Sequence, residues 1–157
     1  MLIQRIMETP IGTLRIEVKN DQLVKIEFLK SFLHIEHEDH PLLDKTELQL
    51  TEYFVGNRQQ FTLPLSFEGT LFQQEVWTAL QTIPYGESCS YQALAQKIQR
   101  DKAVRAVGQA NRRNPLPIVI PCHRVVGKNG SMTGYAGTQI DKKKFLLSLE
   151  KTHCSHV

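Results

Sequence analysis

The chain has 157 residues, of which 41% are hydrophobic and 22% are charged. This composition excludes wholesale disorder and is typical of one globular domain or two small ones. No apolar run approaches the roughly 20 residues that span a bilayer, and the start, MLIQRIMETP, lacks the basic and apolar regions of a signal peptide. We therefore expect no membrane partner and a cytoplasmic protein, or a nuclear one if the source has a nucleus.

The net charge of +3 is unevenly distributed. Residues 1–84 carry seven Lys/Arg and twelve Asp/Glu, a balance of −5, whereas residues 85–157 carry twelve and four, a balance of +8. This asymmetry predicts that only the second half faces a polyanion such as nucleic acid. A solvated lysine-rich surface explains the charge equally well, so the charge leaves both interpretations open.

The first 67 residues predict a small domain with an antiparallel sheet. Apolar and polar residues alternate over 2–8, 14–18 and 23–29, with turn residues between these runs, and residues 41–55 have helical spacing. An irregular stretch over 56–69 follows. We place a domain boundary near Phe67, which gives domains at 1–67 and 68–157.

The second domain is predicted to be mainly helical. One helix begins after Thr70, with Gln73 completing a capping box, and ends at Pro84-Tyr85-Gly86. Ser90 caps a short helix to about Lys97, a tight turn follows at 99–101, and a second helix covers 102–112. Two short helices with this spacing indicate a helix-turn-helix. The second helix and its flanks are basic, at Arg100, Lys102, Arg105, Arg112 and Arg113.

Residues 118–120 are apolar and predict a short buried strand, and Cys122 follows directly. A glycine-rich loop comes next, and a last helix is expected over 142–150, capped by Asp141. The predicted fold class is α+β, with a small N-terminal antiparallel-sheet domain and a mainly helical C-terminal domain that contains a winged-helix-like helix-turn-helix.

The cysteines predict a free thiol. Cys89, Cys122 and Cys154 are odd in number and far apart, which fits neither a disulfide framework nor a zinc site. His34, His37 and His40 lie among acidic residues and favour a solvated loop over a metal site. We therefore expect no metal and no cofactor.

Cys122 stands next to a base and a cation. A thiol is mostly protonated at neutral pH, and a working cysteine needs such neighbours, which His123 and Arg124 supply. For an arbitrary Cys-His pair, however, a buried structural cysteine beside a surface histidine is the commoner arrangement.

The surrounding residues favour the reactive cysteine. The string PIVIPCHRV over 117–125 resembles the active-site signature of the O6-alkylguanine-DNA alkyltransferases, the methylated-DNA–protein-cysteine methyltransferases. Further matches are IPYG over 83–86, RAVG over 105–108, Asn114-Pro115 and GYAG over 134–137. The resemblance covers about residues 70–150, and the first 67 residues match only in general character.

The resemblance implies a single irreversible transfer of a methyl or alkyl group from O6-alkylguanine, and from O4-alkylthymine, to Cys122. Glu150 would orient His123, which would deprotonate Cys122 through a water. Tyr91 would protonate the leaving base, and Asn114 would hold the cysteine loop. The expected substrate-binding residues are Pro117, Val125, Tyr135, Ala136 and Gly137, although Thr138 departs from the family's usual second glycine.

The implied partner is double-stranded DNA, bound by a monomer through its minor groove with the damaged base flipped out. Arg105 resembles the residue that fills the vacated stack, although a phosphate contact is the commoner use of such an arginine. The other expected DNA-binding residues are Ser90, Ala103, Gly108 and Arg112. Two alternatives stay open: a non-catalytic module that binds alkylated DNA, and a cysteine hydrolase.

Overall fold

The computed structural model describes residues 1–30, 37–128 and 139–154. The chain divides into two compact units, Met1–Phe67 and Glu68–Val157. The first contains an antiparallel sheet and the second is mainly helical, so the predicted fold class is confirmed. None of the helices within the described ranges has the length and apolar character needed to cross a bilayer.

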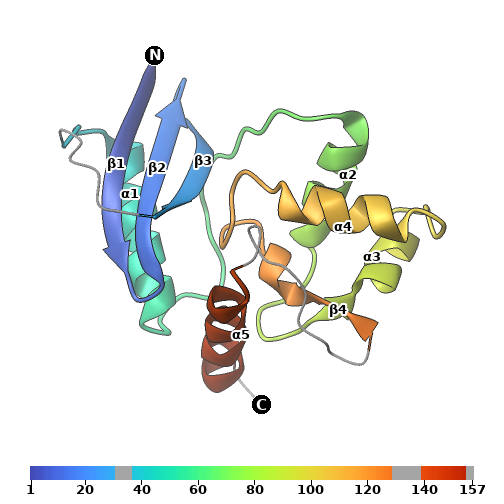
Figure 1. The fold of residues 1–157 in the computed structure, drawn as a ribbon. Coiled ribbons are helices and arrows are strands. Elements are labelled where there is room, and N and C mark those ends of the chain that lie inside the picture. The colour runs from blue at the N-terminus through green and yellow to red at the C-terminus, as the bar shows by residue number, and fades with distance from the viewer. Residues whose placement is uncertain (31–36, 129–138, 155–157) are drawn as a thin grey trace. The chain divides into compact units, whose positions relative to one another are not determined.

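The first unit is a three-stranded meander of β1 (Leu2–Thr9), β2 (Gly12–Lys19) and β3 (Gln22–Leu29), as predicted (Figure 1). The β2–β3 hairpin turns at Asn20 and Asp21, whose φ angles of 51° and 59° suit a tight two-residue hairpin loop. Alternate residues of β2 are buried, at Leu14, Ile16 and Val18, and the buried Leu23 and Ile26 of β3 pair with Val18 and Ile16 across a register shift. Together these residues give the sheet one apolar face.

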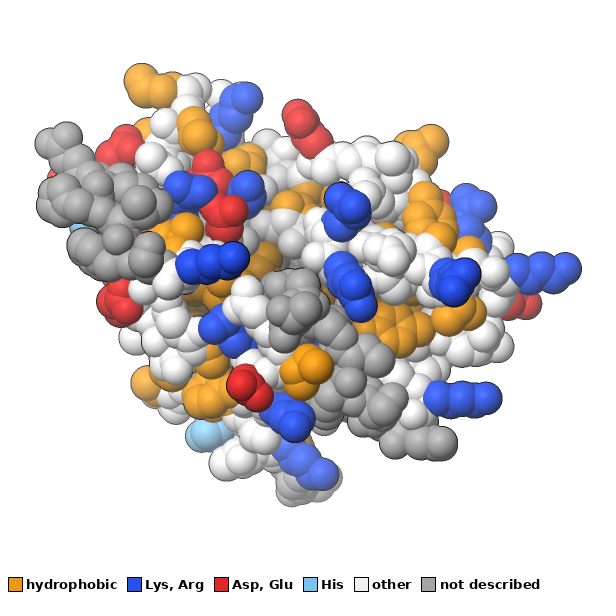
Figure 2. All heavy atoms as spheres, in the orientation of Figure 1, with side chains coloured by type: hydrophobic (Ala, Val, Ile, Leu, Met, Phe, Trp, Pro, Cys, Tyr) orange, Lys and Arg blue, Asp and Glu red, His pale blue; other side chains and the backbone are white. Residues whose placement is uncertain are grey.

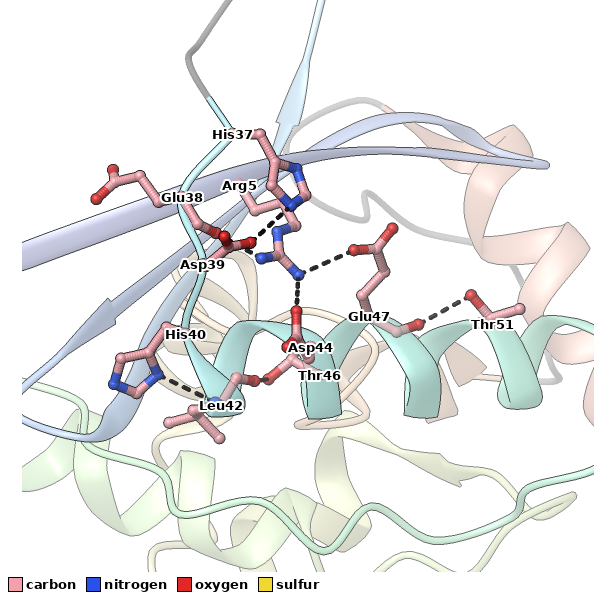
Figure 3. A network of polar contacts seen from close by, with 10 residues as sticks. All are labelled: Arg5, His37, Glu38, Asp39, His40, Leu42, Asp44, Thr46, Glu47 and Thr51. Carbon is pink, nitrogen blue, oxygen red and sulfur yellow. Dashed lines mark hydrogen bonds and ion pairs between the residues drawn. The ribbon is translucent and has the colours of Figure 1, made fainter.

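Helix α1 (Pro41–Phe54) packs against β1 and β2. His40 is its N-cap, because Nδ1 of His40 accepts the backbone N–H of Leu42 at 3.0 Å. The buried Arg5 of β1 joins the sheet to this helix. Its Nη1 donates to Asp44 at 2.7 Å and to Glu47 at 3.2 Å (Figure 3). These contacts hold α1 against β1.

The second unit begins with α2 (Leu71–Leu80), where the predicted capping box of Thr70 and Gln73 is present. Helices α3 (Tyr91–Lys97) and α4 (Val104–Arg112) then form the helix-turn-helix, and Ser90 caps α3 as expected. Trp77 of α2 donates its indole N–H to the carbonyl of Ala110 at 2.8 Å. This bond ties the end of α4 to α2.

The bounds of helices α4 and α5 differ from prediction. Helix α4 begins at Val104 and not at 102, because residues 100–103 form a turn and Ala103, at the N-cap position, has no side chain that could cap. Helix α5 (Ile140–His153) is longer at both ends than the predicted 142–150. Its N-cap position is Gln139, and Asp141 lies within the first turn, so the predicted cap is wrong.

Candidate active site

Cys122 lies at the end of a buried loop. The strand predicted over 118–120 is absent: Ile118 has a φ of +77°, and the N–H of Ile120 returns to the carbonyl of Leu116 at 2.8 Å. Three prolines in this segment, at 115, 117 and 121, lack the N–H that a strand would donate. The apolar character of residues 118–120 therefore reflects burial of the loop and not pairing in a sheet.

After this loop the chain forms a single 3-10 turn, η1 (Cys122–Arg124), which leads into β5 (Val125–Val126). Strand β5 pairs in parallel with β4 (Cys89–Ser90), directly before α3. The short sheet therefore connects the cysteine turn to the start of the helix-turn-helix. All three residues of η1 are buried.

The carboxylate of Glu150, on α5, is the centre of the site. Nε2 of His123 lies 2.6 Å from its Oε2, while Nε and Nη2 of Arg124 donate to Oε1 and Oε2 at 2.8 and 3.0 Å. The backbone N–H of Gly86 also donates to Oε1, at 3.3 Å. Arg124 was expected beside Cys122 as a source of positive charge, but its guanidinium pairs with Glu150.

These contacts set the protonation of the buried pair. Burial on its own would raise the pKa of Glu150, but hydrogen bonds and charges from His123 and Arg124 lower that pKa to about 2. Burial lowers the pKa of His123 below its usual value, and the opposing influence of Glu150 does not reverse this. Glu150 is therefore an anion and His123 a neutral imidazole at neutral pH.

The tautomer of His123 follows from the same geometry. An ionised carboxylate only accepts hydrogen bonds, so Nε2 carries the proton that points to Glu150. The basic lone pair of the ring then lies on Nδ1. A neutral imidazole with this orientation is chemically suited to act as a general base.

Cys122 rests as a thiol. It is 3% exposed, and this burial raises its pKa to about 11, although a hydrogen bond from Asn114 and the charge of Lys143 act in the opposite direction. A thiolate in so dry a site requires a base to take its proton.

Asn114 braces the loop that precedes the cysteine. Its Nδ2 donates to the carbonyl of Ile120 at 2.8 Å, and its Oδ1 accepts the N–H of Leu116 at 2.9 Å. The Asn114 side chain thereby joins two points of the loop between α4 and η1. Asn111, on the last turn of α4, donates from Nδ2 to the carbonyl of Cys122 at 3.3 Å.

Lys143 of α5 is fully buried. Its Nζ donates to the carbonyl of Val125 at 2.5 Å and lies 5.9 Å from the centre of the Tyr91 ring. Tyr91 also lies beside α4, because a Cβ added to Gly108 would be 3.8 Å from that ring. Tyr91, Lys143 and the Val125 carbonyl are therefore close to one another.

Sequence reasoning missed the site contacts of Lys143 and Asn111. Lys143 looks like part of a solvated run of lysines at 142–144, but it lies seven residues before Glu150, two helical turns along the same face of α5. That spacing was the available signal. Asn111 offered only a weak signal, its position near Val107 and Ala110 on the apolar side of α4.

The outer face of α4 is basic. Arg105 and Arg112 are exposed, as are the neighbouring Lys102 and Arg113, and Figure 2 shows several Lys and Arg side chains over this helix. Arg100 differs, because it forms an ion pair with Glu75 at 3.0 Å. The other four cations form no ion pair with the residues that the structure describes.

Four other predicted residues lie in the helix-turn-helix or in the loop before the cysteine. Ser90 uses its hydroxyl to cap α3, Ala103 and Gly108 are half-buried at α4, and Pro117 is buried before the cysteine. Tyr135, Ala136, Gly137 and His34 lie outside the described residues. His40 contacts Asp21 at 3.1 Å, and His37 lies 3.5 Å from Asp39.

Both units are similar to parts of one known protein family. Residues 2–67 match the family model described as "6-O-methylguanine DNA methyltransferase, ribonuclease-like domain", and residues 71–152 match the "DNA binding domain" of the same methyltransferase. The constitutive methylated-DNA–protein-cysteine methyltransferase of Bacillus subtilis is 49% identical over 152 residues, which is 92% of each chain. The Methanosarcina acetivorans methyltransferase is 44% identical over 92% of this chain and 96% of its own.

Solved structures of methyltransferases are similar to this chain over nearly its whole length. The crystal structure of the Mycobacterium tuberculosis O6-methylguanine methyltransferase has a TM-score of 0.88 and 39% identity, covering 100% of this chain and 97% of that one. The structure of the M. tuberculosis protein in complex with DNA has a TM-score of 0.86 and 41% identity, covering 96% and 93%. Because these matches span both units and the cysteine turn, the chain belongs to the family of methylated-DNA–protein-cysteine methyltransferases.

Proposed function

We propose that this chain repairs DNA by transferring an alkyl group from O6 of guanine, or O4 of thymine, to Sγ of Cys122. The observation that carries this proposal is the buried Glu150–His123 pair directly beside the cysteine. In the transfer, the bond from the alkyl carbon to the base oxygen breaks and a carbon–sulfur bond forms. The product is a thioether, and each molecule reacts once.

His123 is the proposed base. Its lone pair on Nδ1 takes the thiol proton through a water, and the imidazolium that forms is stabilised by the carboxylate of Glu150 at 2.6 Å. Arg124 keeps that carboxylate ionised and oriented through two hydrogen bonds. The pair therefore supplies charge stabilisation when the thiol loses its proton.

The leaving base must receive a proton, because an anionic guanine leaves poorly. The hydroxyl of Tyr91 is the proposed donor, and the backbone at Cys122, Val125 and Ala136 is proposed to contact the edge of the base. The position of Tyr91 next to Lys143 and the Val125 carbonyl supports this assignment. Pro117, Tyr135 and Gly137 complete the proposed substrate site.

We further propose that a monomer binds the minor groove of double-stranded DNA through α4 and flips the damaged base out. The exposed cations of α4 and the half-buried Ala103 and Gly108 support a helix that lies close to the phosphates. Arg105 is the proposed residue that fills the vacated stack, with Ser90 and Arg112 at the flanks. A cytoplasmic location, or a nuclear one in a eukaryote, stays a prediction.

The test is incubation with a duplex that carries one O6-methylguanine, followed by digestion and mass spectrometry. The proposal requires a single methyl group on the Cys122 peptide, one equivalent of repaired base, and no transfer by Cys122→Ala. Cys154→Ala is the matched control and should react normally. DNA binding without a mass change would indicate a binding module, and repeated turnover of an ester would indicate a hydrolase.

The role of Arg105 has its own test. Arg105→Ala should slow repair of the duplex more than it slows the reaction with free O6-alkylguanine base, because the free base needs no flipping. Lys102→Ala, which removes a neighbouring exposed cation, controls for the loss of one positive charge. Equal slowing of both substrates by Arg105→Ala would refute the flipping role.

A further inference from the structure

The amide of Asn111 is buried between the helix-turn-helix and the cysteine turn. Asn111 is 2% exposed on the last turn of α4, and its Nδ2 donates to the carbonyl of Cys122. Its Oδ1 is also buried and has no hydrogen-bond partner among the residues that the structure describes. Because a carbonyl only accepts, the contact with Cys122 sets which end of the amide faces the cysteine.

This arrangement is costly for the fold. A buried amide oxygen without a partner destabilises the native state, whereas an apolar side chain of similar size would not. Buried polar groups of this kind call for an explanation other than packing. The bond from Nδ2 to the Cys122 carbonyl is the contact through which Asn111 reaches the site.

The carbonyl of Cys122 is held by two donors. The backbone N–H of Val125 donates to it within η1, and Asn111 donates to it from α4. The N–H of Cys122 is held as well, by the carbonyl of Ile120 at 2.8 Å. The peptide groups on both sides of Cys122 are thus oriented, and its side chain leaves the backbone in a defined direction.

The exposed Arg105 lies on the other side of α4. One side of this helix therefore faces solvent, and the other side contacts the backbone of Cys122. The end of this helix is also held by Trp77, through the carbonyl of Ala110. Trp77 thus anchors α4 to α2, while Asn111 joins α4 to the backbone of Cys122. The two bonds offer a matched pair for experiment.

We propose that Asn111 is a positioning residue for the alkyl transfer. Its hydrogen bond fixes the Cys122 peptide relative to α4 and thereby aims Sγ along the line of attack on the alkyl carbon. Asn111 does not touch the substrate. The inference rests on the proposed role of Cys122 as the acceptor.

The first test is Asn111→Leu, which removes the donor and keeps the size of the side chain. The single-turnover rate should fall by about tenfold, and equally with methylated duplex and with free O6-alkylguanine base, since one hydrogen bond to the nucleophile's backbone is lost. The melting temperature should not fall. Trp77→Phe, the control, should lower the melting temperature and leave the rate unchanged well below it.

The second test is Asn111→Asp, which restores a donor only when its carboxyl is protonated. The rate of this variant divided by the wild-type rate should rise toward one as the pH falls, while the ratio for Asn111→Leu stays constant. A wild-type rate in folded Asn111→Leu would overturn the proposal, as would a loss confined to duplex DNA.

Mass spectrometry of the wild-type protein separates this inference from the proposed function. A methyl group on a residue other than Cys122 would refute both. A methyl group on Cys122 together with an unchanged rate in Asn111→Leu would refute only the positioning role.

Discussion

Replacement of Glu150 by glutamine tests the central feature of the site. Glutamine has the shape of glutamate but no charge, so Glu150→Gln leaves the buried guanidinium of Arg124 without an anion. It also offers His123 an amide in place of a carboxylate. If the amide N–H₂ faces Nε2, the proton of the imidazole must move to Nδ1, where it blocks proton transfer from Cys122.

The magnitude follows from the pKa of Glu150, which is about 2 in the folded protein against an ordinary 4.5. A difference of roughly 2.5 units corresponds to at most about 3 kcal/mol of stability from the ionised form at pH 7, because part of the lowering comes from a charged His123 that is neutral at that pH. We expect Glu150→Gln to lower the free energy of unfolding by up to this amount. We expect the transfer rate to fall by about 10² to 10⁴, the range of general-base catalysis.

The stability assay is urea unfolding followed by the fluorescence of Trp77, the single tryptophan, which is buried in the second unit. The rate comes from single-turnover repair of a methylated duplex. Glu75→Gln is the matched control, because it removes an exposed ion pair with Arg100 in the same unit and should change stability by less than about 1 kcal/mol. A folded Glu150→Gln protein with the wild-type rate would refute the proposed base.

Four further predictions concern stability. The pKa values of His123 and Glu150 both lie below their ordinary 6.5 and 4.5, so the unfolded chain binds protons that the folded chain does not. The contribution of this pair to the free energy of unfolding should therefore be fully present above about pH 6.5 and should decline as the pH falls toward 2. A urea midpoint that stays constant from pH 7 to 4 would contradict this. Gly108→Ala should raise stability by about 0.5–1 kcal/mol, because the new Cβ has no contact closer than 3.8 Å. Gly86→Ala should lower it by about 1–3 kcal/mol or more, because φ is +81° and the Cβ would lie 2.7 Å from that of Cys154; equal melting temperatures for the two variants would show this reasoning to be wrong. Thr70→Ala should cost about 1 kcal/mol through loss of the capping box, while the exposed Thr78→Ala on the same helix should cost less.

Local features of the chain were predictable because neighbouring residues determine them. The alternation of β1 to β3, the turn at Asn20 and Asp21, and the capping box at Thr70 all depend on contacts within a few residues. The string around Cys122 likewise identified the family, since it carries the nucleophile and its histidine in adjacent positions. Such local patterns can be recognised in the sequence without knowledge of the tertiary contacts.

The chemistry of the site depends on contacts that no local pattern encodes. Arg124 pairs with Glu150 across 26 residues, Lys143 reaches the Val125 carbonyl across 18, and Asn111 reaches Cys122 across 11. The same apolar run that predicted a strand at 118–120 forms a buried turn, because Ile118 has a positive φ and the flanking prolines cannot donate to a sheet. Burial and charge pairing arise only when distant segments pack together, and here they leave Cys122 protonated at rest beside a neutral His123.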